Sequence, residues 1–89
     1  GKLWENFLAI ERLKMQTYST MHANNYFWRT WDKKEIDWIE EREGKLFGFE
    51  FKFSAAKVRA PKDFLETYPE ASFATVNPHN YLAFVGAGR

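Results

Sequence analysis

The sequence contains no cysteine, so a disulfide framework and a thiolate metal site are both excluded. No apolar run approaches the roughly 18 residues that a membrane-spanning helix needs. No pattern of a cleaved signal peptide is visible at the amino end either. These absences predict a protein that has no membrane segment, and we expect a cytoplasmic location.

A large excess of one charge is also missing, because 13 basic and 12 acidic residues give a formal net charge of +1. Dedicated nucleic-acid-binding domains are usually more basic, so a large phosphate-binding surface is not expected. A local basic cluster remains, formed by Lys57, Arg59 and Lys62. No glycine-rich phosphate loop is present, so nothing in these 89 residues is expected to bind a nucleotide.

Two other kinds of site lack their usual residues. His22 and His79 are far apart in the chain, and neither has further ligands nearby, which argues against a zinc centre. No histidine is placed to activate a nucleophile in any of the hydroxyl residues considered. Those residues are Ser19, Thr20, Ser54 and Ser72.

Aromatic residues, in contrast, are abundant and make up 19% of the chain. Such an apolar load predicts a folded core, and the length of 89 residues predicts one domain spanning 1–89. The chain begins with Gly1 rather than Met and opens directly on a helical pattern. We therefore expect it to be a segment of a longer protein.

Periodicity and turn residues predict the element order α-β-β-β-α-β. The elements are a helix at 2–18, strands at 26–31, 35–42 and 45–54, a helix at 61–68 and a strand at 72–77. We expect turns at Asn24-Asn25 and at Glu43-Gly44, and only a short apolar tail at 81–85. The short connections favour an antiparallel meander for the first three strands. The predicted fold class is therefore α/β (α+β), with a central four-stranded mixed sheet flanked by helices.

The strand predicted at 45–54 alternates phenylalanine with other residues. Because a strand alternates its faces with period two, one face is a phenylalanine ladder and the other presents Gly48, Glu50 and Lys52. Asp37 lies in the middle of the preceding strand. If the hairpin register brings Asp37 beside Glu50, two carboxylates and one ammonium converge.

Two interpretations of this trio are open. Two carboxylates can hold Mg²⁺, with the Phe51 carbonyl as a further ligand, and a lysine can assist phosphodiester hydrolysis. The alternative is a ladder of surface ion pairs, which is common and contributes little. Helices must cover part of this sheet, and a partly covered Glu/Lys pair calls for a partner or a function.

The helix predicted at 2–18 has an apolar arc. That arc comprises Leu3, Trp4, Phe7, Leu8, Ile10 and Met15. Glu11 projects near the middle of the arc, whereas Glu5 lies off it. We leave two roles open for Glu11, either a third acidic contributor to the site or a salt bridge to an arginine such as Arg29.

Three tryptophans fall on or near the predicted strands, namely Trp28, Trp31 and Trp38. Their rings can stack on nucleic-acid bases, or they can pack in the core. A chain with this many aromatic residues favours core packing.

The ordered pattern resembles the PD-(D/E)XK nuclease-like superfamily, which includes restriction endonucleases and archaeal Holliday-junction resolvases. More closely, the chain looks like the uncharacterised C-terminal domain of a group of bacterial and archaeal AAA-type ATPases. Five segments that cover essentially the whole chain carry this likeness. They are LWENFLAIERL at 3–13, YFWRT at 26–30, EIDWIEE at 35–41, GKLFGFEFK at 44–52 and TYPEASFATVNPHNY at 67–81.

The resemblance implies a restriction-endonuclease-like fold, with Asp37 and Glu50 as ligands of Mg²⁺ or Mn²⁺, Lys52 as the catalytic lysine and Glu5 as an additional acidic residue. It also implies Mg-dependent hydrolysis of DNA and an ATPase domain upstream in the same chain. Ile36 stands where the superfamily's name has proline. A non-catalytic partner-binding module on the same fold, or an oligomerisation domain that uses strand 26–31 as an edge, are the alternatives.

Overall fold

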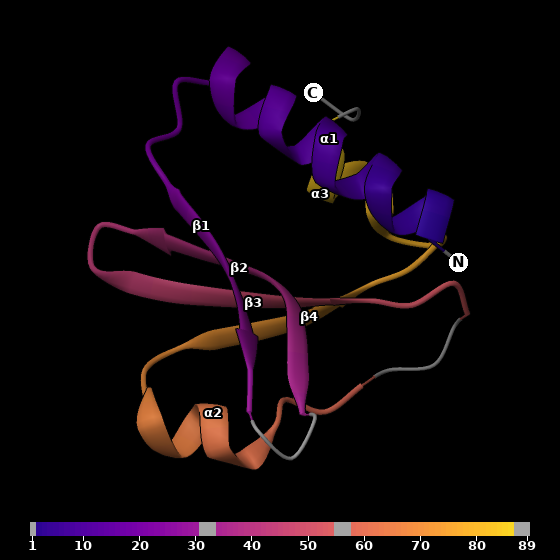
Figure 1. Ribbon diagram of the computed structural model, residues 1–89. Helices are drawn as coiled ribbons and strands as arrows, with labels where there is room; N and C mark the ends of the chain where they lie inside the picture. The colour runs from indigo at the N-terminus through magenta and orange to yellow at the C-terminus, as the bar shows by residue number, and fades with distance from the viewer. Residues whose placement is uncertain (1, 31–33, 55–57, 87–89) are drawn as a thin grey trace.

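The computed structural model describes residues 2–30, 34–54 and 58–86, which form three helices and four strands (Figure 1). The helices and strands are α1 Lys2–Tyr18, β1 Asn24–Arg29, β2 Glu35–Arg42, β3 Lys45–Phe51, α2 Lys62–Thr67, β4 Ser72–Val76 and α3 Tyr81–Val85. No helix in these ranges is long and apolar enough to cross a bilayer.

The four strands form one sheet in the order β1-β2-β3-β4. β1 and β3 both pair antiparallel with β2, whereas β4 runs parallel to β3. The predicted mixed sheet and three-stranded meander are therefore confirmed. The predicted hairpin turn is confirmed too, because Glu43 and Gly44 both have positive φ, at 53° and 78°. Positive φ at both central residues is the hairpin geometry that matches strand twist.

Helices cover both faces of the sheet, with α1 and α3 on one side and α2 on the other (Figure 1). The phenylalanine ladder of β3 faces α3, where the rings of Phe49 and Phe51 pack edge-on against Phe84. The opposite face packs Ile36 and Ile39 against Phe64 of α2. The period-two prediction for β3 is thus confirmed.

Gly48 faces α2, on the side that also carries Glu50. A Cβ atom at Gly48 would lie 3.2 Å from the Phe73 ring, which is tighter than an ordinary contact. The missing side chain therefore lets α2 and β4 pack closely on this face.

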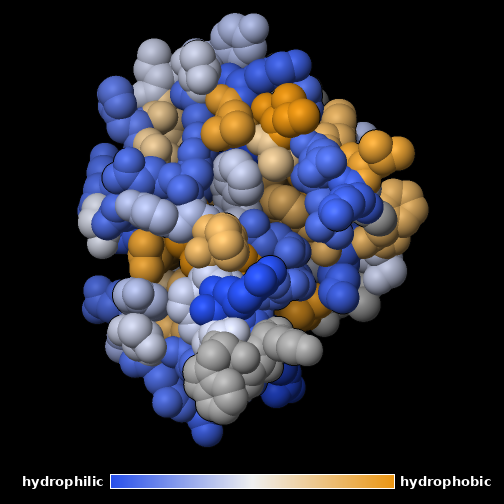
Figure 2. Space-filling view, in the orientation of Figure 1, coloured by the Kyte–Doolittle hydropathy of each residue, from blue (hydrophilic) through white to orange (hydrophobic). Residues whose placement is uncertain are grey.

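α1 buries only part of its predicted apolar arc, namely Leu8 and Met15, while Trp4 packs against the core at its edge. Its buried residues are Leu8, Arg12, Met15 and Gln16. Leu3 is 86% exposed, and Phe7 and Ile10 are exposed as well. Figure 2 accordingly shows hydrophobic side chains at the surface over α1. A charged and a polar side chain have taken the place of apolar ones beneath this helix.

The remaining differences concern the ends of elements. Asn24 and Asn25, predicted as a turn, are the first residues of β1, and β3 ends at Phe51 rather than at 54. The segment predicted as an apolar tail is the short helix α3. Gly86 ends α3 in the left-handed conformation, with φ of 77°, as helix-terminating glycines commonly do.

Candidate functional site

The strand register brings Asp37 and Glu50 to neighbouring positions. Trp38 pairs with Phe49 in the antiparallel β2–β3 ladder, so one further step places Asp37 opposite Glu50. The hypothesis that the hairpin joins the two carboxylates is therefore supported by the pairing. Lys52 follows two residues after Glu50, just past the end of β3 at Phe51.

A bulge in β2 lies between Ile36 and Ile39, in the interval that contains Asp37. Tyr26 of β1 lies opposite Ile39, whereas Trp28 lies opposite Ile36, so β2 has one extra residue in this interval. A bulge interrupts the ladder and reorients side chains. Here an Asp37 carboxylate oxygen accepts the backbone N–H of Phe51 at 2.9 Å. The Asp37 side chain thus provides an acceptor for β3 beside this irregularity.

Glu50 is half-buried and incompletely paired. Its Oε1 atom is buried and has no hydrogen-bond partner. Burial, followed by the charge and side-chain hydrogen bond of Asp37, raises the pKa of the Glu50 carboxyl to about 7. The Asp37 backbone and the Lys52 charge pull this pKa down more weakly. Both the protonated and the ionised form of the Glu50 carboxyl are therefore populated near pH 7.

The Lys52 side chain is exposed, and its charge acts on Glu50. Its backbone N–H donates to the Val76 carbonyl at 2.9 Å, which continues the β3–β4 contact past the end of β3. The main chain at Lys52 is therefore fixed, while the ammonium faces solvent beside the carboxylate pair.

Two glutamates of α1, Glu5 and Glu11, were also candidates for the acidic set. Glu11 pairs with Lys14 at 3.1 Å and not with Arg29, which pairs with Glu35 at 3.0 Å. Glu5 is exposed, and no described contact joins it to Asp37 or Glu50. It does lie at the same end of the domain as Lys52, because the adjacent residues Trp4 and Phe53 stack edge-on at 5.3 Å.

The acidic pair has the donor chemistry of a site for a hard divalent cation. Asp37 and Glu50 are neighbouring carboxylates, and the unpartnered Oε1 of Glu50 is an oxygen without a protein donor. Among residues 2–30, 34–54 and 58–86, no three His, Asp or Glu side chains cluster closely enough to form a metal site by themselves. A cation held here would therefore rely on two side-chain carboxylates.

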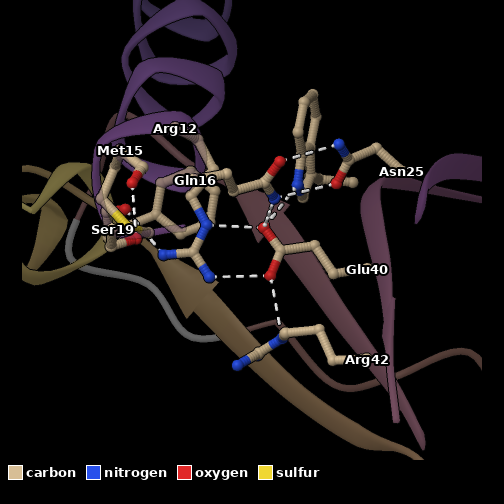
Figure 3. A network of polar contacts seen from close by, with 9 residues as sticks. Arg12, Met15, Gln16, Ser19, Asn25, Glu40 and Arg42 are labelled. Carbon is tan, nitrogen blue, oxygen red and sulfur yellow. Dashed lines mark hydrogen bonds and ion pairs between the residues drawn. The ribbon is translucent and has the colours of Figure 1, made fainter. Parts of the chain in front are cut away.

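A polar cluster beneath α1 was not predicted from the sequence (Figure 3). Glu40 of β2 is fully buried beneath α1. Its carboxylate accepts two N–H groups of Arg12, one of them at 2.8 Å, and the Gln16 amide at 2.7 Å. The Trp38 indole donates to it at 3.0 Å, and Arg42 approaches it at 3.2 Å. Charge and hydrogen bonds together explain why α1 buries polar residues.

Arg12 also ties α3 to this cluster, because its third nitrogen donates to the Phe84 carbonyl at 2.8 Å. Burial by itself would raise the pKa of the Glu40 carboxyl, but the hydrogen bond and charge of Arg12, with help from Trp38 and Arg42, outweigh it and lower that pKa. A signal existed in the sequence, since Glu40 shares the strand face of Trp38 and Arg12 follows Leu8 by one helical turn.

The other predicted candidates lie apart from the acidic pair. Trp28 packs on Phe64 at 5.7 Å, and Trp38 serves the Glu40 cluster, so both have core contacts. Trp31, and Lys57 of the basic cluster, lie outside the described residues.

The histidines occupy separate places. His22 lines a surface pocket together with Glu41 and Glu43. The backbone N–H of His79 donates to the Asn77 side chain in the turn before α3.

Comparison with known families gives one match. The matching family model is described as a domain of unknown function, DUF4143, and it covers residues 1–84. Comparisons with curated proteins and with solved structures give no match. A family model that spans nearly the whole chain establishes membership, and the chain belongs to the DUF4143 family.

Proposed function

We propose that this domain is a nuclease-like domain of the PD-(D/E)XK type, which cleaves DNA phosphodiester bonds with the help of Mg²⁺ or Mn²⁺. The observation that carries the proposal is the Asp37–Glu50 pair, formed across two strands, with a buried oxygen that has no protein partner. Two neighbouring carboxylates repel each other when ionised, and a divalent cation between them would relieve that repulsion.

The named residues divide the work as follows. Asp37 and Glu50 would hold the cation, which supplies Lewis-acid stabilisation of charge on the phosphoryl group. Lys52 presents a solvent-exposed ammonium beside them and would neutralise charge on a bound phosphate. Phe51 keeps the Asp37 carboxylate in place through its N–H. Glu5 remains a candidate for an additional acidic contact from the start of α1.

We also propose that this domain is part of a longer protein that contains an ATPase domain. The resemblance to the C-terminal domain of AAA-type ATPases suggests that an ATPase domain of the same chain works with this one. DNA is then the expected substrate, in a cytoplasmic setting.

The test separates metal binding from cleavage. Titration of the domain with Mn²⁺, followed by calorimetry, should show binding that Asp37→Asn removes and Lys52→Ala retains. Nicking of supercoiled DNA should fall by about 100-fold or more with Lys52→Ala, since a charge-stabilising group is lost. Asp63→Asn is the matched control, because the Asp63 carboxylate is half-exposed and pairs with Lys34 at 3.7 Å, on α2 and away from the acidic pair.

Metal binding should also depend on pH. Because a ligating carboxylate must lose its proton, Mn²⁺ should bind more tightly as the pH rises through about 7, the pKa of Glu50. Wild-type protein that binds no Mn²⁺ at pH 8, or nicking that Asp37→Asn leaves unchanged, would refute the nuclease proposal.

A second candidate function is a non-catalytic partner-binding module on the same fold. The Asp37 carboxylate already has a structural task in accepting the Phe51 N–H, which favours this alternative. Metal-independent binding of the domain to a partner, with no nicking under any condition, would support it.

A further inference from the structure

A groove of about 350 Å³ lies at the β1 edge of the sheet, on the face that carries α2. The rings of Tyr26, Trp28 and Tyr68 line it, together with aliphatic side chains and one carboxylate, Glu41. Tyr26 is 52% exposed and Tyr68 is 40% exposed, so their rings are open to a ligand. Glu41 lies near the end of β2, whereas Asp37 lies near its beginning, so the groove is distinct from the acidic pair.

The Glu41 carboxylate lacks a cationic partner within the described parts of the chain. It accepts hydrogen bonds from the Tyr26 hydroxyl at 3.4 Å and from the Asn24 amide at 3.3 Å, and both donors are neutral. Glu35 and Glu40, by comparison, each pair with an arginine. The half-buried Glu41 carboxylate beside these aromatic rings could therefore pair with a cation supplied by a ligand.

Aromatic faces and a carboxylate together favour a cationic side chain. Cations are attracted to the faces of aromatic rings, and a neighbouring carboxylate adds direct charge attraction. The domain already uses this arrangement internally, because the Arg42 guanidinium lies 3.8 Å from the centre of the Phe47 ring while pairing with Glu40. The groove offers the same two elements without the arginine.

The strand that borders the groove is an edge of the sheet. β1 pairs with β2 on one side only, and none of the described residues pairs with its other side. Edge strands present unpaired N–H and C=O groups, to which an extended peptide can add as a further strand. Alternate side chains of such a peptide would point to the α2 face, where Tyr26 and Trp28 lie.

We propose that the β1 edge and its aromatic groove bind an extended polypeptide segment and take up an arginine or lysine side chain against Glu41, Tyr26 and Tyr68. The segment adds to β1 in backbone register, and its positive charge gives specificity. The occupant is a separate basic polypeptide and not a second copy of this chain.

The experiment uses two capped peptides titrated into the whole 89-residue domain by calorimetry at physiological salt. One peptide alternates threonine with arginine, and the other carries glutamine in place of each arginine. The arginine peptide should bind, and the glutamine peptide should bind about tenfold more weakly or not at all. On binding, outward-facing amides of β1 should gain protection from hydrogen exchange.

Two variants locate the charge recognition. Glu41→Gln should weaken binding of the arginine peptide by about tenfold, and Tyr68→Leu, which keeps an apolar side chain but loses the ring face, by about fivefold. Glu11→Gln is the matched control, because it removes one negative charge from α1 on the other side of the sheet, and it should change affinity less than about twofold.

Three results would overturn the proposal. Equal affinity for the two peptides would show that positive charge is not recognised. Unchanged binding of the arginine peptide by Glu41→Gln would show that the peptide does not bind at this groove. Sedimentation that shows a dimer in the absence of peptide, together with protection of the same β1 amides, would make a second copy the occupant.

Discussion

Glu40 and Glu50 lie on adjacent strands of one sheet, but their surroundings are opposite. Glu40 is fully buried and receives hydrogen bonds from three different side chains, and its pKa is lowered. Glu50 is half-buried beside another carboxylate, keeps one oxygen without a partner, and its pKa is raised to about 7. The Glu40 carboxylate has hydrogen-bond donors from the fold itself, whereas one oxygen of the Glu50 carboxylate has none.

The two carboxylates differ more in their partners than in their burial, because Glu40 has three side-chain donors and Glu50 lies beside Asp37 with one oxygen unpartnered. A buried carboxylate with a complete set of donors stabilises one arrangement of α1, β2 and α3. A carboxylate held near a like charge costs free energy in the folded state, and groups with such perturbed pKa values are concentrated at functional sites. Three substitutions probe the two sides of the comparison, and a fourth, at the exposed Glu35, gives a baseline.

The largest effect is expected from Arg12→Ala. This change leaves Glu40 as an uncompensated buried charge and frees the Phe84 carbonyl, so the free energy of unfolding should fall by about 3–5 kcal/mol. Urea denaturation measures it. A loss below about 1 kcal/mol would show that water replaces Arg12 and that Glu40 is less isolated than the structure indicates.

A smaller loss is expected from Trp38→Phe. The indole N–H that donates to Glu40 at 3.0 Å disappears, while most of the apolar ring is kept. Because the other donors remain, the free energy of unfolding should drop by about 1–3 kcal/mol. If Trp38→Phe proved as damaging as Arg12→Ala, the cluster would behave as one indivisible unit, and the assignment to single donors would be wrong.

Glu50→Gln should act in the opposite direction. A raised folded-state pKa means that stability from the protonated carboxyl is present below about pH 4.5 and is lost as the pH rises to about 7. The variant should therefore unfold at a higher temperature than wild type at pH 8 and at a similar temperature at pH 4. We expect a gain on the order of 1 kcal/mol, since water screens a half-buried site. Equal melting temperatures at pH 8 would contradict the raised pKa.

The smallest effect is expected from Glu35→Gln. Its ion pair with Arg29 is 50% and 62% exposed on the two sides, so the free energy of unfolding should change by less than about 1 kcal/mol. This exposed carboxylate is the baseline for the other two. A loss comparable to that of Arg12→Ala would mean that the exposure of a carboxylate does not determine how much its ion pair contributes to the free energy of unfolding.

The sequence predicted local pattern better than long-range pairing. The alternation of phenylalanines in β3 placed Phe49 and Phe51 on one face and Glu50 on the other, because strand periodicity depends on the backbone alone. The hairpin turn at Glu43-Gly44 followed from glycine chemistry, and it set the register that joins Asp37 to Glu50.

The polar cluster beneath α1 could not be predicted in the same way. Helical periodicity assigns polar residues to the outside, and so Leu3 and Ile10 were expected to be buried in place of Arg12 and Gln16. A buried arginine is stable only beside an acidic partner. Here that partner is Glu40, which lies 28 residues away in the sequence, so the pair could not be predicted from α1 alone. The bulge between Ile36 and Ile39 could not be predicted either, since it depends on how β1 and β2 pair.

The acidic pair has a consequence for the order of folding. Asp37 and Glu50 lie in one hairpin, so only a short loop must close to bring them together, whereas β4 reaches β3 only after the long connection that contains α2. Contacts between residues close in sequence generally form faster than distant ones. We expect the two carboxylates to meet early in folding, and their mutual repulsion to oppose that early hairpin until a proton or a cation joins them.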